Sequence, residues 1–307
     1  MVAAPTLGLT RGTYRARVLS QGDRTVQTVN RIVPLRDAIS ALKRSGRVAL
    51  VPTMGALHEG HLTLVRAAKA AAEHVVVSIF VNPRQFGANE DLDAYPRQLA
   101  RDSELLEGEG VDLLWAPDAA AMYPAGYATN ISVSGVSENL CGAARPGHFD
   151  GVATVVCKLF NQVCPDIALF GEKDWQQLAV IRRMARDLDL TLPHADAIIG
   201  VPTVREADGL AMSSRNAYLT PGQRQAAATL PRAMAGAIEA IGAGTPVESA
   251  IATLEAALLA GGFSSVDYAA LCDAGSLQPL GERGEAPARL LVAARIGTTR
   301  LIDNMPA

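Results

Sequence analysis

The 307-residue chain lacks a long apolar run, a strong charge imbalance and closely spaced cysteines. Its longest apolar stretches fall far short of the roughly 20 residues that cross a bilayer, so we predict no membrane segment. A formal net charge of -3 gives no basic footprint for nucleic acid, which we do not expect as a partner. The four cysteines form no CxxC pair. We predict that Cys157 and Cys164, in an apolar helical stretch, are small buried thiols rather than ligands or a disulfide.

The first thirty residues lack the apolar core of a signal peptide. They contain arginines and no acidic residue before Asp23, which leaves a transit peptide open, but we expect residues 1–30 to form a flexible extension. The chain has no internal repeat. Its 49% hydrophobic and 19% charged residues are typical of a soluble cytoplasmic enzyme, and its length suffices for two domains.

Short apolar segments alternate with segments of helical spacing over the first two thirds of the chain. The predicted strands are 47–51, 74–81, 111–116, 167–170 and 197–201, and the predicted helices are 62–72, 103–109, 151–163 and 176–188. The second strand is apolar on both faces, as in the centre of a parallel sheet. We therefore predict an α/β fold with a doubly wound, Rossmann-like parallel sheet over residues 31–203. Its ligands should bind beyond the carboxyl ends of the strands.

The pattern changes after about residue 203. Ala-rich helices are predicted at 223–241 and 246–260, and strands at 265–272 and 289–294. We predict that residues 204–307 form a smaller α+β domain, hinged near residues 200–204.

Residues 51–61, with the sequence VPTMGALHEGH, are the most informative segment. A strand, a Gly-rich turn and a helix in this order aim backbone N–H groups at a phosphate. Residues i and i+3 share a helix face, so His58 and His61 can both donate to phosphoryl oxygens. A helix start with two exposed histidines stays open as an alternative. A zinc site is disfavoured because the two histidines are spaced i, i+3, whereas those of the HExxH zinc helix are spaced i, i+4.

A polar segment, residues 208–216, follows the predicted hinge; we call it the clamp segment. Two hydroxyls and a guanidinium, on Ser213, Ser214 and Arg215, suit a phosphate clamp. A cluster that caps the next helix is the alternative. Two further motifs, 82–86 and 171–177, directly follow predicted strands, which places three motifs at one edge of the sheet.

The HxGH element and the Met-Ser-Ser-Arg segment together resemble the HIGH and KMSKS pair of the class I aminoacyl-tRNA synthetase and nucleotidyltransferase superfamily. A narrower resemblance is to the pantothenate synthetase (pantoate–β-alanine ligase) family, whose motifs occur here in the same order. They are VPTMGALHEGH at 51–61, FVNPRQF at 80–86, DAYPR at 93–97, RPGHF at 145–149, FGEKDWQQ at 170–177 and the clamp segment. The resemblance runs from about residue 48 to the LIDN sequence at 301–304. It departs at Cys141, where the family often has a glutamate that could position Arg145.

The resemblance implies that the chain joins pantoate to β-alanine with ATP and Mg²⁺. The pantoate carboxylate would attack the α-phosphorus of ATP, giving pantoyl adenylate and pyrophosphate. The β-alanine amine would then attack the acyl carbon, and AMP would leave. We also expect a homodimer.

The resemblance also assigns site residues by motif. Residues implied in catalysis are His58, His61, Lys173, Ser213, Ser214 and Arg215. Those implied in ATP binding are Pro52, Thr53, Met54, Gly60, Gly171, Lys173, Asp174, Val204 and Met212. Asn82, Gln85 and Gln177 would bind pantoate, and Arg145 and His148 would belong to a mobile flap. Asp102 would help to hold Mg²⁺, with simple surface solvation as the alternative.

Two other functions remain alternatives at this point. A nucleotidyltransferase of the same fold would need an extra basic pocket for a phosphorylated acceptor, whereas the acceptor wall here offers amides. A non-catalytic nucleotide-binding regulator would have no reason to keep Lys173, both histidines and the clamp segment together.

Overall fold

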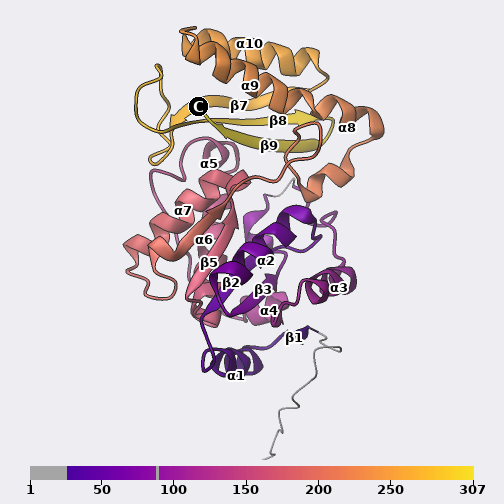
Figure 1. Cartoon of the computed structure of the whole chain (residues 1–307), viewed down its shortest axis with the longest axis vertical. Helices are drawn as coiled ribbons and strands as arrows, with labels where there is room; N and C mark the ends of the chain where they lie inside the picture. Colours follow the sequence, from indigo (N-terminus) through magenta and orange to yellow (C-terminus); the bar gives the residue numbers. More distant parts are fainter. Residues whose placement is uncertain (1–25, 88–89) are drawn as a thin grey trace, which may run out of the picture.

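The computed structural model describes residues 26–87 and 90–307, which form two sheets, each with its own helices (Figure 1). The first sheet has six parallel strands in the order β1-β4-β3-β2-β5-β6. These strands are β1 (Gln27–Val29), β2 (Val48–Thr53), β3 (His74–Ile79), β4 (Leu113–Trp115), β5 (Ile167–Gly171) and β6 (Ile198–Val201). The predicted α/β class and the doubly wound parallel sheet are confirmed.

The strand order reverses beside β2. After β2 the chain builds β3 and β4 on one side, and later β5 and β6 on the other. Ligands of doubly wound sheets bind at the carboxyl ends of the strands where the order reverses. The three motifs at 53–61, 82–86 and 171–177 follow β2, β3 and β5, so this reversal brings them to one edge.

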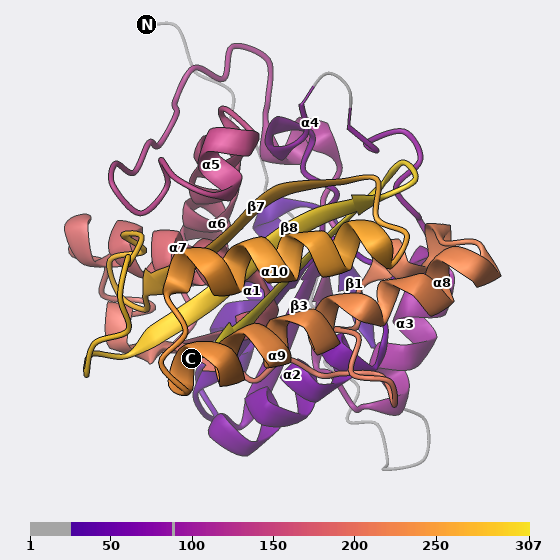
Figure 2. The same cartoon turned by 90° about the horizontal axis from the view of Figure 1, so that it is seen from above.

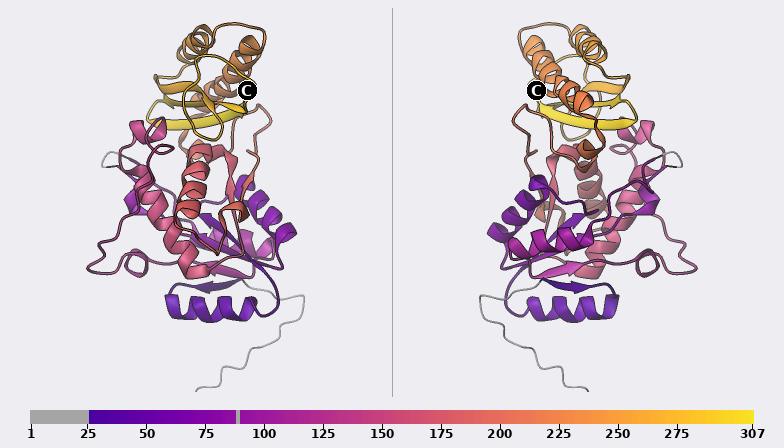
Figure 3. Two further views of the ribbon diagram at one scale, coloured as in Figure 1. Left: turned by 90° about the vertical axis from the view of Figure 1, so that its left-hand side faces the viewer. Right: turned by 90° about the vertical axis from the view of Figure 1, so that its right-hand side faces the viewer.

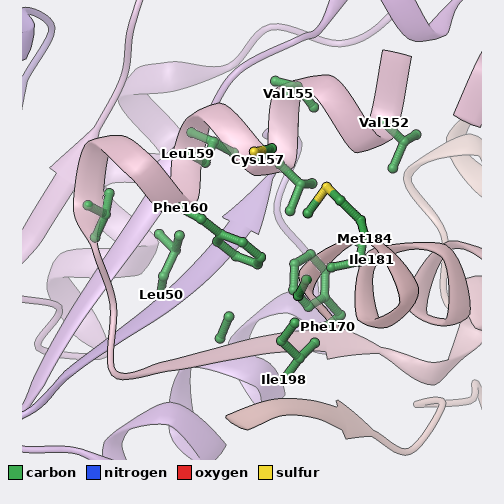
Figure 4. Close-up of a cluster of buried hydrophobic side chains, with 14 of the residues drawn as sticks. Leu50, Val152, Val155, Cys157, Leu159, Phe160, Phe170, Ile181, Met184 and Ile198 are labelled. Atoms are coloured by element: carbon green, nitrogen blue, oxygen red, sulfur yellow. The ribbon is translucent and has the colours of Figure 1, made fainter. Parts of the chain in front are cut away.

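Helices cover both faces of the parallel sheet. One face carries α2 (Glu59–Ala71) and α3 (Leu99–Gly108); the other carries α1 (Ile32–Leu42), α6 (His148–Val163) and α7 (Trp175–Asp187). Alternate residues of β2 therefore enter different cores. Leu50 packs with α6 and α7, near Phe160 and Met184 (Figure 4), whereas Val51 packs with α2. This explains why the central strands are apolar on both faces.

Helix α6 lies against the 3₁₀ turn η1 (Pro83–Gln85). A Cβ on Gly151 would lie 2.3 Å from the carbonyl oxygen of Arg84, so only glycine permits this approach. The same helix contains Cys157, which is buried as predicted. The prediction of a buried thiol is wrong for Cys164, which follows the last residue of α6 in a left-handed conformation and is exposed.

The second sheet is antiparallel, in the order β7-β8-β9. It consists of β7 (Ser265–Asp273), β8 (Ala288–Ile296) and β9 (Thr299–Pro306), preceded by α8 (Pro221–Ala227), α9 (Thr229–Gly242) and α10 (Val247–Ala260). Helices α9 and α10 lie side by side over one face of this sheet (Figure 2). The opposite face is turned toward the parallel sheet, as the side views show (Figure 3).

Several elements differ from the predictions, among them α1, which the sequence did not predict. The predicted helix over 223–241 is two helices, because the ring of Pro231 in a continuous helix would clash with the carbonyl of Ala227. The predicted extension 1–30 falls mostly outside the described residues, but residues 27–29 form the edge strand β1. The LIDN sequence lies within strand β9, which the sequence had not predicted. Within the described ranges, no helix combines the length and apolarity that a bilayer crossing requires.

Candidate active site between the two sheets

A cavity of about 620 Å³ lies between the carboxyl edge of the parallel sheet and the strands β7, β8 and β9. This volume lies within the usual range for sites that bind small molecules. Every residue that the sequence predicted for the site lines the cavity, except Asp102. The prediction that several separate motifs meet at one edge is therefore matched by the cavity lining.

His58 and His61 begin helix α2, with ring centroids 4.1 Å apart. The Nδ1 atom of His58 accepts a hydrogen bond from the amide of Gly60 at 3.2 Å. The Nδ1 atom of His61 accepts one from the amide of His58 at 3.3 Å. An Nδ1 that accepts cannot carry a proton, so each neutral ring holds its proton on Nε2 and can donate it. The backbone of the helix start thus selects the tautomer of both histidines.

Both rings stay neutral at physiological pH. Burial, followed by the charge of Lys173, lowers the pKa of His58 to about 4. Burial, followed by His58 and Lys173, lowers the pKa of His61 to about 3. The two side chains therefore act as neutral Nε2–H donors, and Lys173 supplies the positive charge beside them.

Gly60 lies directly below the His58 ring. A Cβ at this position would lie 2.9 Å from Cε1 of His58, closer than real Cβ contacts. Met212 of the clamp segment is the next neighbour, at 3.8 Å. The glycine therefore lets the imidazole fold back over the helix start and accept the amide of residue 60.

The turn between β2 and α2 is held by Asp102 of α3. Gly55 and Ala56 both have positive φ values, of 82° and 51°. The Asp102 carboxylate accepts the amides of Ala56 and Leu57, each at 2.9 Å, and its residue is 1% exposed. Both oxygens bind the turn, and Asp102 does not line the cavity, so its predicted help in holding Mg²⁺ stays a prediction. The alternative of surface solvation is wrong, because the residue is buried.

The predicted pantoate-binding amides lie on two elements. Asn82 is buried and joins β3 to α6: its Nδ2 donates to the carbonyl of Gly151 at 3.0 Å, and its Oδ1 accepts from Tyr123 at 2.8 Å. Nδ2 of Asn82 also donates to Oε1 of Gln85 at 3.1 Å. Gln85 and, from α7, Gln177 line the cavity. Asn82 thus orients Gln85 in addition to lining the cavity.

The clamp segment follows the predicted hinge and is tied to it by a backbone hydrogen bond. The amide of Met212 donates to the carbonyl of Val204 at 3.0 Å. Ser213 accepts the amide of Arg215 at 3.3 Å, so it also caps the 3₁₀ turn η4 (Ser214–Tyr218). Ser214 donates to the carbonyl of Ala56 at 3.1 Å, which connects the clamp segment to the turn above β2. Both the clamp and the capping interpretation are therefore compatible with the geometry.

Two acidic residues that the sequence did not single out each hold one arginine of the cavity lining. Asp91 accepts from Nε and Nη2 of Arg215 at 3.0 and 2.8 Å. Glu90 accepts from Nε of Arg145 at 2.6 Å. Burial alone would raise the pKa of each carboxyl. The neighbouring arginine lowers that pKa by more, so the net shift is downward. Acidic loop residues are usually solvated, so the sequence offered no signal for these pairs.

Arg145 and His148 form a connected pair at the start of α6. Nη1 of Arg145 lies 3.0 Å from Nε2 of His148, whose Nδ1 lies 2.8 Å from the carbonyl of Gln85. Burial and the charge of Arg145 lower the pKa of His148 to about 4. Cys141 contacts Arg145 through the backbone, where its carbonyl accepts the amide of Arg145 at 2.9 Å. Its Sγ lies 3.0 Å from Oη of Tyr268, so the thiol does not take the place of the carboxylate that could position Arg145 in the family.

Comparison with known proteins identifies the family. The family model described as pantoate-beta-alanine ligase matches residues 27–306. The chain is 69% identical to the pantothenate synthetase of Novosphingobium aromaticivorans over 281 residues, which cover 91% of this chain and 98% of that protein. It is 62% identical to the pantothenate synthetase of Sphingopyxis alaskensis over 282 residues, which cover 92% and 99% of the two chains.

Solved structures agree. The crystal structure of pantothenate synthetase from Thermus thermophilus is similar with a TM-score of 0.84 and 49% identity, covering 91% of this chain and 99% of that chain. The pantoate-beta-alanine ligase of Francisella tularensis, complexed with beta-gamma ATP and beta-alanine, has a TM-score of 0.77 and 33% identity, covering 92% and 97%. By sequence and by structure, the chain belongs to the pantoate–β-alanine ligase family.

Proposed function

We propose that this ATP-dependent ligase condenses pantoate with β-alanine through a pantoyl adenylate, releasing pyrophosphate and then AMP. One observation carries this route. Donors suited to a triphosphate (His58, His61, Lys173 and Arg215) line the same cavity as the amides of Gln85 and Gln177. One cavity with both sets of groups can align two anionic reactants.

The first step needs charge neutralisation and alignment, because a carboxylate must attack a phosphorus surrounded by negative oxygens. Lys173 and Arg215 would supply positive charge at the phosphates. The Nε2–H groups of His58 and His61 would donate to oxygens on which charge develops. Donors that are already oriented need no rearrangement during the reaction, which is the main source of electrostatic catalysis.

Pantoate would bind along the amide wall. Gln85 and Gln177 each offer a donor and an acceptor, which suits a hydroxyl and a carboxylate. Met54 and Phe80, which also line the cavity, give apolar neighbours to the gem-dimethyl group. Nε2 of Gln85 already lies 3.0 Å from the sulfur of Met54, so polar and apolar contacts adjoin.

ATP would bind with Pro52, Thr53, Gly171 and Val204 around its nucleoside, and with the acidic Asp174 near its ribose. Mg²⁺ would enter with ATP and be held by phosphate oxygens, several waters and one or two carboxylates, as is usual for this ion. Of the carboxylates in the lining, Glu90, Asp91 and Asp303 are paired with arginines. These three carboxylates therefore balance arginine charge around the cavity.

The second step requires no protein nucleophile, because the β-alanine amine attacks the acyl carbon of the adenylate directly. The residues of the cavity would serve this step by keeping water from a hydrolysable intermediate.

We further propose that residues 204–307 act as a lid domain over residues 31–203. A homodimer and a cytoplasmic location stay predictions, and sedimentation equilibrium would test the first.

A pyrophosphate-release assay tests the route. With ATP, Mg²⁺ and pantoate but no β-alanine, we expect release of about one pyrophosphate per site, and steady turnover once β-alanine is added. AMP must appear only in the second condition. ADP and phosphate as products would instead mean acyl-phosphate chemistry and would overturn the adenylate route.

A further inference from the structure

Asn304 of β9 is a buried amide whose side chain reaches across to the parallel sheet. It is 3% exposed, and its Nδ2 donates to the carbonyls of both Glu172 and Lys173, each at 2.9 Å. These two residues belong to the 3₁₀ turn η2 (Glu172–Asp174), which leads from β5 into α7. Asn304 lies on an element of the second sheet, yet its polar contacts lie at the backbone that carries Lys173.

The anchor of Asn304 is rigid. Its residue pairs with Leu291 of β8 in the antiparallel ladder. Its amide donates to Oδ1 of the preceding Asp303 at 2.8 Å. Asp303, whose side chain is fully buried, binds both terminal nitrogens of Arg205 at 2.7 and 2.9 Å. The backbone of Asn304 is thus held by a strand and by an ion pair, independently of the contact that its side chain makes with the turn.

Arg289 completes the arrangement from β8. Its guanidinium donates to Oδ1 of Asn304, and it also binds the Glu172 carboxylate at 3.2 Å. The same group lies over the ring of Trp175, 3.5 Å from its centroid. Arg289 therefore orients the amide of Asn304 so that its NH₂ group faces the two carbonyls of the turn.

We propose that Asn304 is a positioning residue for Lys173. Through its bonds to the turn η2, Asn304 sets the position of the lysine ammonium in the cavity and couples that position to the second sheet. The inference rests on the proposed role of Lys173 in the adenylation step. One amide binds the carbonyls of two adjacent residues, which leaves the backbone of the turn little freedom to rotate. The Cα atom of Lys173 therefore has a defined position.

The chemistry of the contact requires asparagine. An amide supplies two N–H donors for the carbonyls and one oxygen for Arg289. Aspartate at this position would have the same shape but no donor, and would place a negative oxygen against two carbonyl oxygens. Alanine would remove the contact and leave the carbonyls without this partner.

Two variants and a control separate positioning from simple stability. Asn304→Ala removes the contact, and Asn304→Asp keeps the volume in case the alanine variant does not fold. The control is Val292→Ala, in β8, which removes apolar volume from the core of the same sheet and lies outside the cavity lining. Adenylate formation is measured as pyrophosphate release without β-alanine. The second step is measured from supplied pantoyl adenylate, and stability from thermal unfolding.

We expect Asn304→Ala and Asn304→Asp to slow adenylate formation by about ten- to a hundredfold, the loss typical of a group displaced by about 1 Å. The second step should change by less than about twofold, because Lys173 is proposed to act at the triphosphate, which has left as pyrophosphate before that step. In a Lys173→Ala background, Asn304→Ala should have almost no further effect, since residues that act through one another are not additive.

The outcomes distinguish this inference from the function on which it rests. Wild-type adenylate formation in Lys173→Ala would overturn the role of the lysine, and the positioning role with it. A slow Lys173→Ala together with normal Asn304 variants would overturn the positioning role alone. Equal losses in both steps, as expected of Val292→Ala if lower stability reduces the active fraction, would also overturn it.

Discussion

At the scale of single residues, the histidine pair shows how a helix start can orient a hydrogen-bond donor. Each Nδ1 accepts a backbone amide, so the proton must stand on Nε2. Low pKa values of about 4 and about 3 keep His58 and His61 uncharged. The donor capacity of both histidines therefore does not depend on their protonation at neutral pH.

The lowered pKa values predict that acid destabilises the fold before the carboxylates titrate. The unfolded chain binds protons on histidine near pH 6.5, whereas folded His148 binds one only near 4. The free energy of unfolding contributed by these groups is thus complete above pH 6.5 and falls as the pH drops toward 4. Urea unfolding near pH 7 and near pH 5 should show this loss. His148→Gln should show a smaller difference between the two conditions; an unchanged difference would remove His148 as a contributor.

Gly60→Ala should slow adenylate formation by about a hundredfold, because the new Cβ displaces the His58 ring and a misplacement of about 1 Å costs that much. Gly222→Ala is a matched control: it occupies the same second position of helix α8, and a Cβ there meets nothing within 4 Å. The control should keep full activity. An active Gly60→Ala enzyme would show that the His58 position is not critical.

At the scale of elements, the central strands of the parallel sheet could be predicted from the sequence because they are buried on both faces, whereas the exposed edge strand β1 and helix α1 were not predicted. β2, β3 and β5 lie where the apolar runs predicted them. The break before α9 was missed because the alanine-rich spacing continues through Pro231. Strand β9 was missed because its polar Asp303 and Asn304 are buried by contacts with Arg205 and with the turn η2, and no local pattern reveals such partners.

Among the site residues, those carried by motifs could be predicted, and those held by distant partners could not. Lys173 and both histidines stand in motifs after strands. Asp91 and Asn304 act through bonds to residues more than a hundred positions away. For Asp102, the sequence predicted an acidic group near the site but not that two amides of a strained turn would occupy it.

Asp102→Asn tests the role of the α3 carboxylate in the turn. Asparagine offers one acceptor oxygen, so one of the two amides of Ala56 and Leu57 loses its partner, at a cost of about 1–3 kcal/mol in the free energy of unfolding. The Mg²⁺ concentration at half-maximal activity should not change. A large rise in that concentration without loss of stability would instead support the direct metal role.

At the scale of the whole molecule, contacts of the clamp segment connect the two sheets. Ser214 binds the turn after β2, and Arg215 binds Asp91. These bonds define a position in which the clamp segment lies over the cavity. The second sheet contributes the opposite wall, with Tyr268 and Arg300 in the lining.

Binding of ATP and Mg²⁺ should slow amide hydrogen exchange in residues 204–220, because closure over the nucleotide removes the segment from solvent. Arg215→Ala should weaken this protection and slow adenylate formation together. Exchange in α10, which lies on the far side of the second sheet, serves as the internal control. If saturating ATP leaves exchange in residues 204–220 unchanged, the lid would be abandoned and the chemistry kept.

The contact between Gly151 and the turn at Arg84 has a consequence for redesigning the enzyme. The acceptor amide of Gln85 stands on backbone that touches the backbone of α6, with no side chain between them to absorb a change. Substitutions aimed at a new acid substrate can therefore vary Gln85, Gln177 or Met54. They cannot vary residue 151, where one methyl group would push the whole wall into the cavity. The choice of substrate is limited here by a residue that has no side chain.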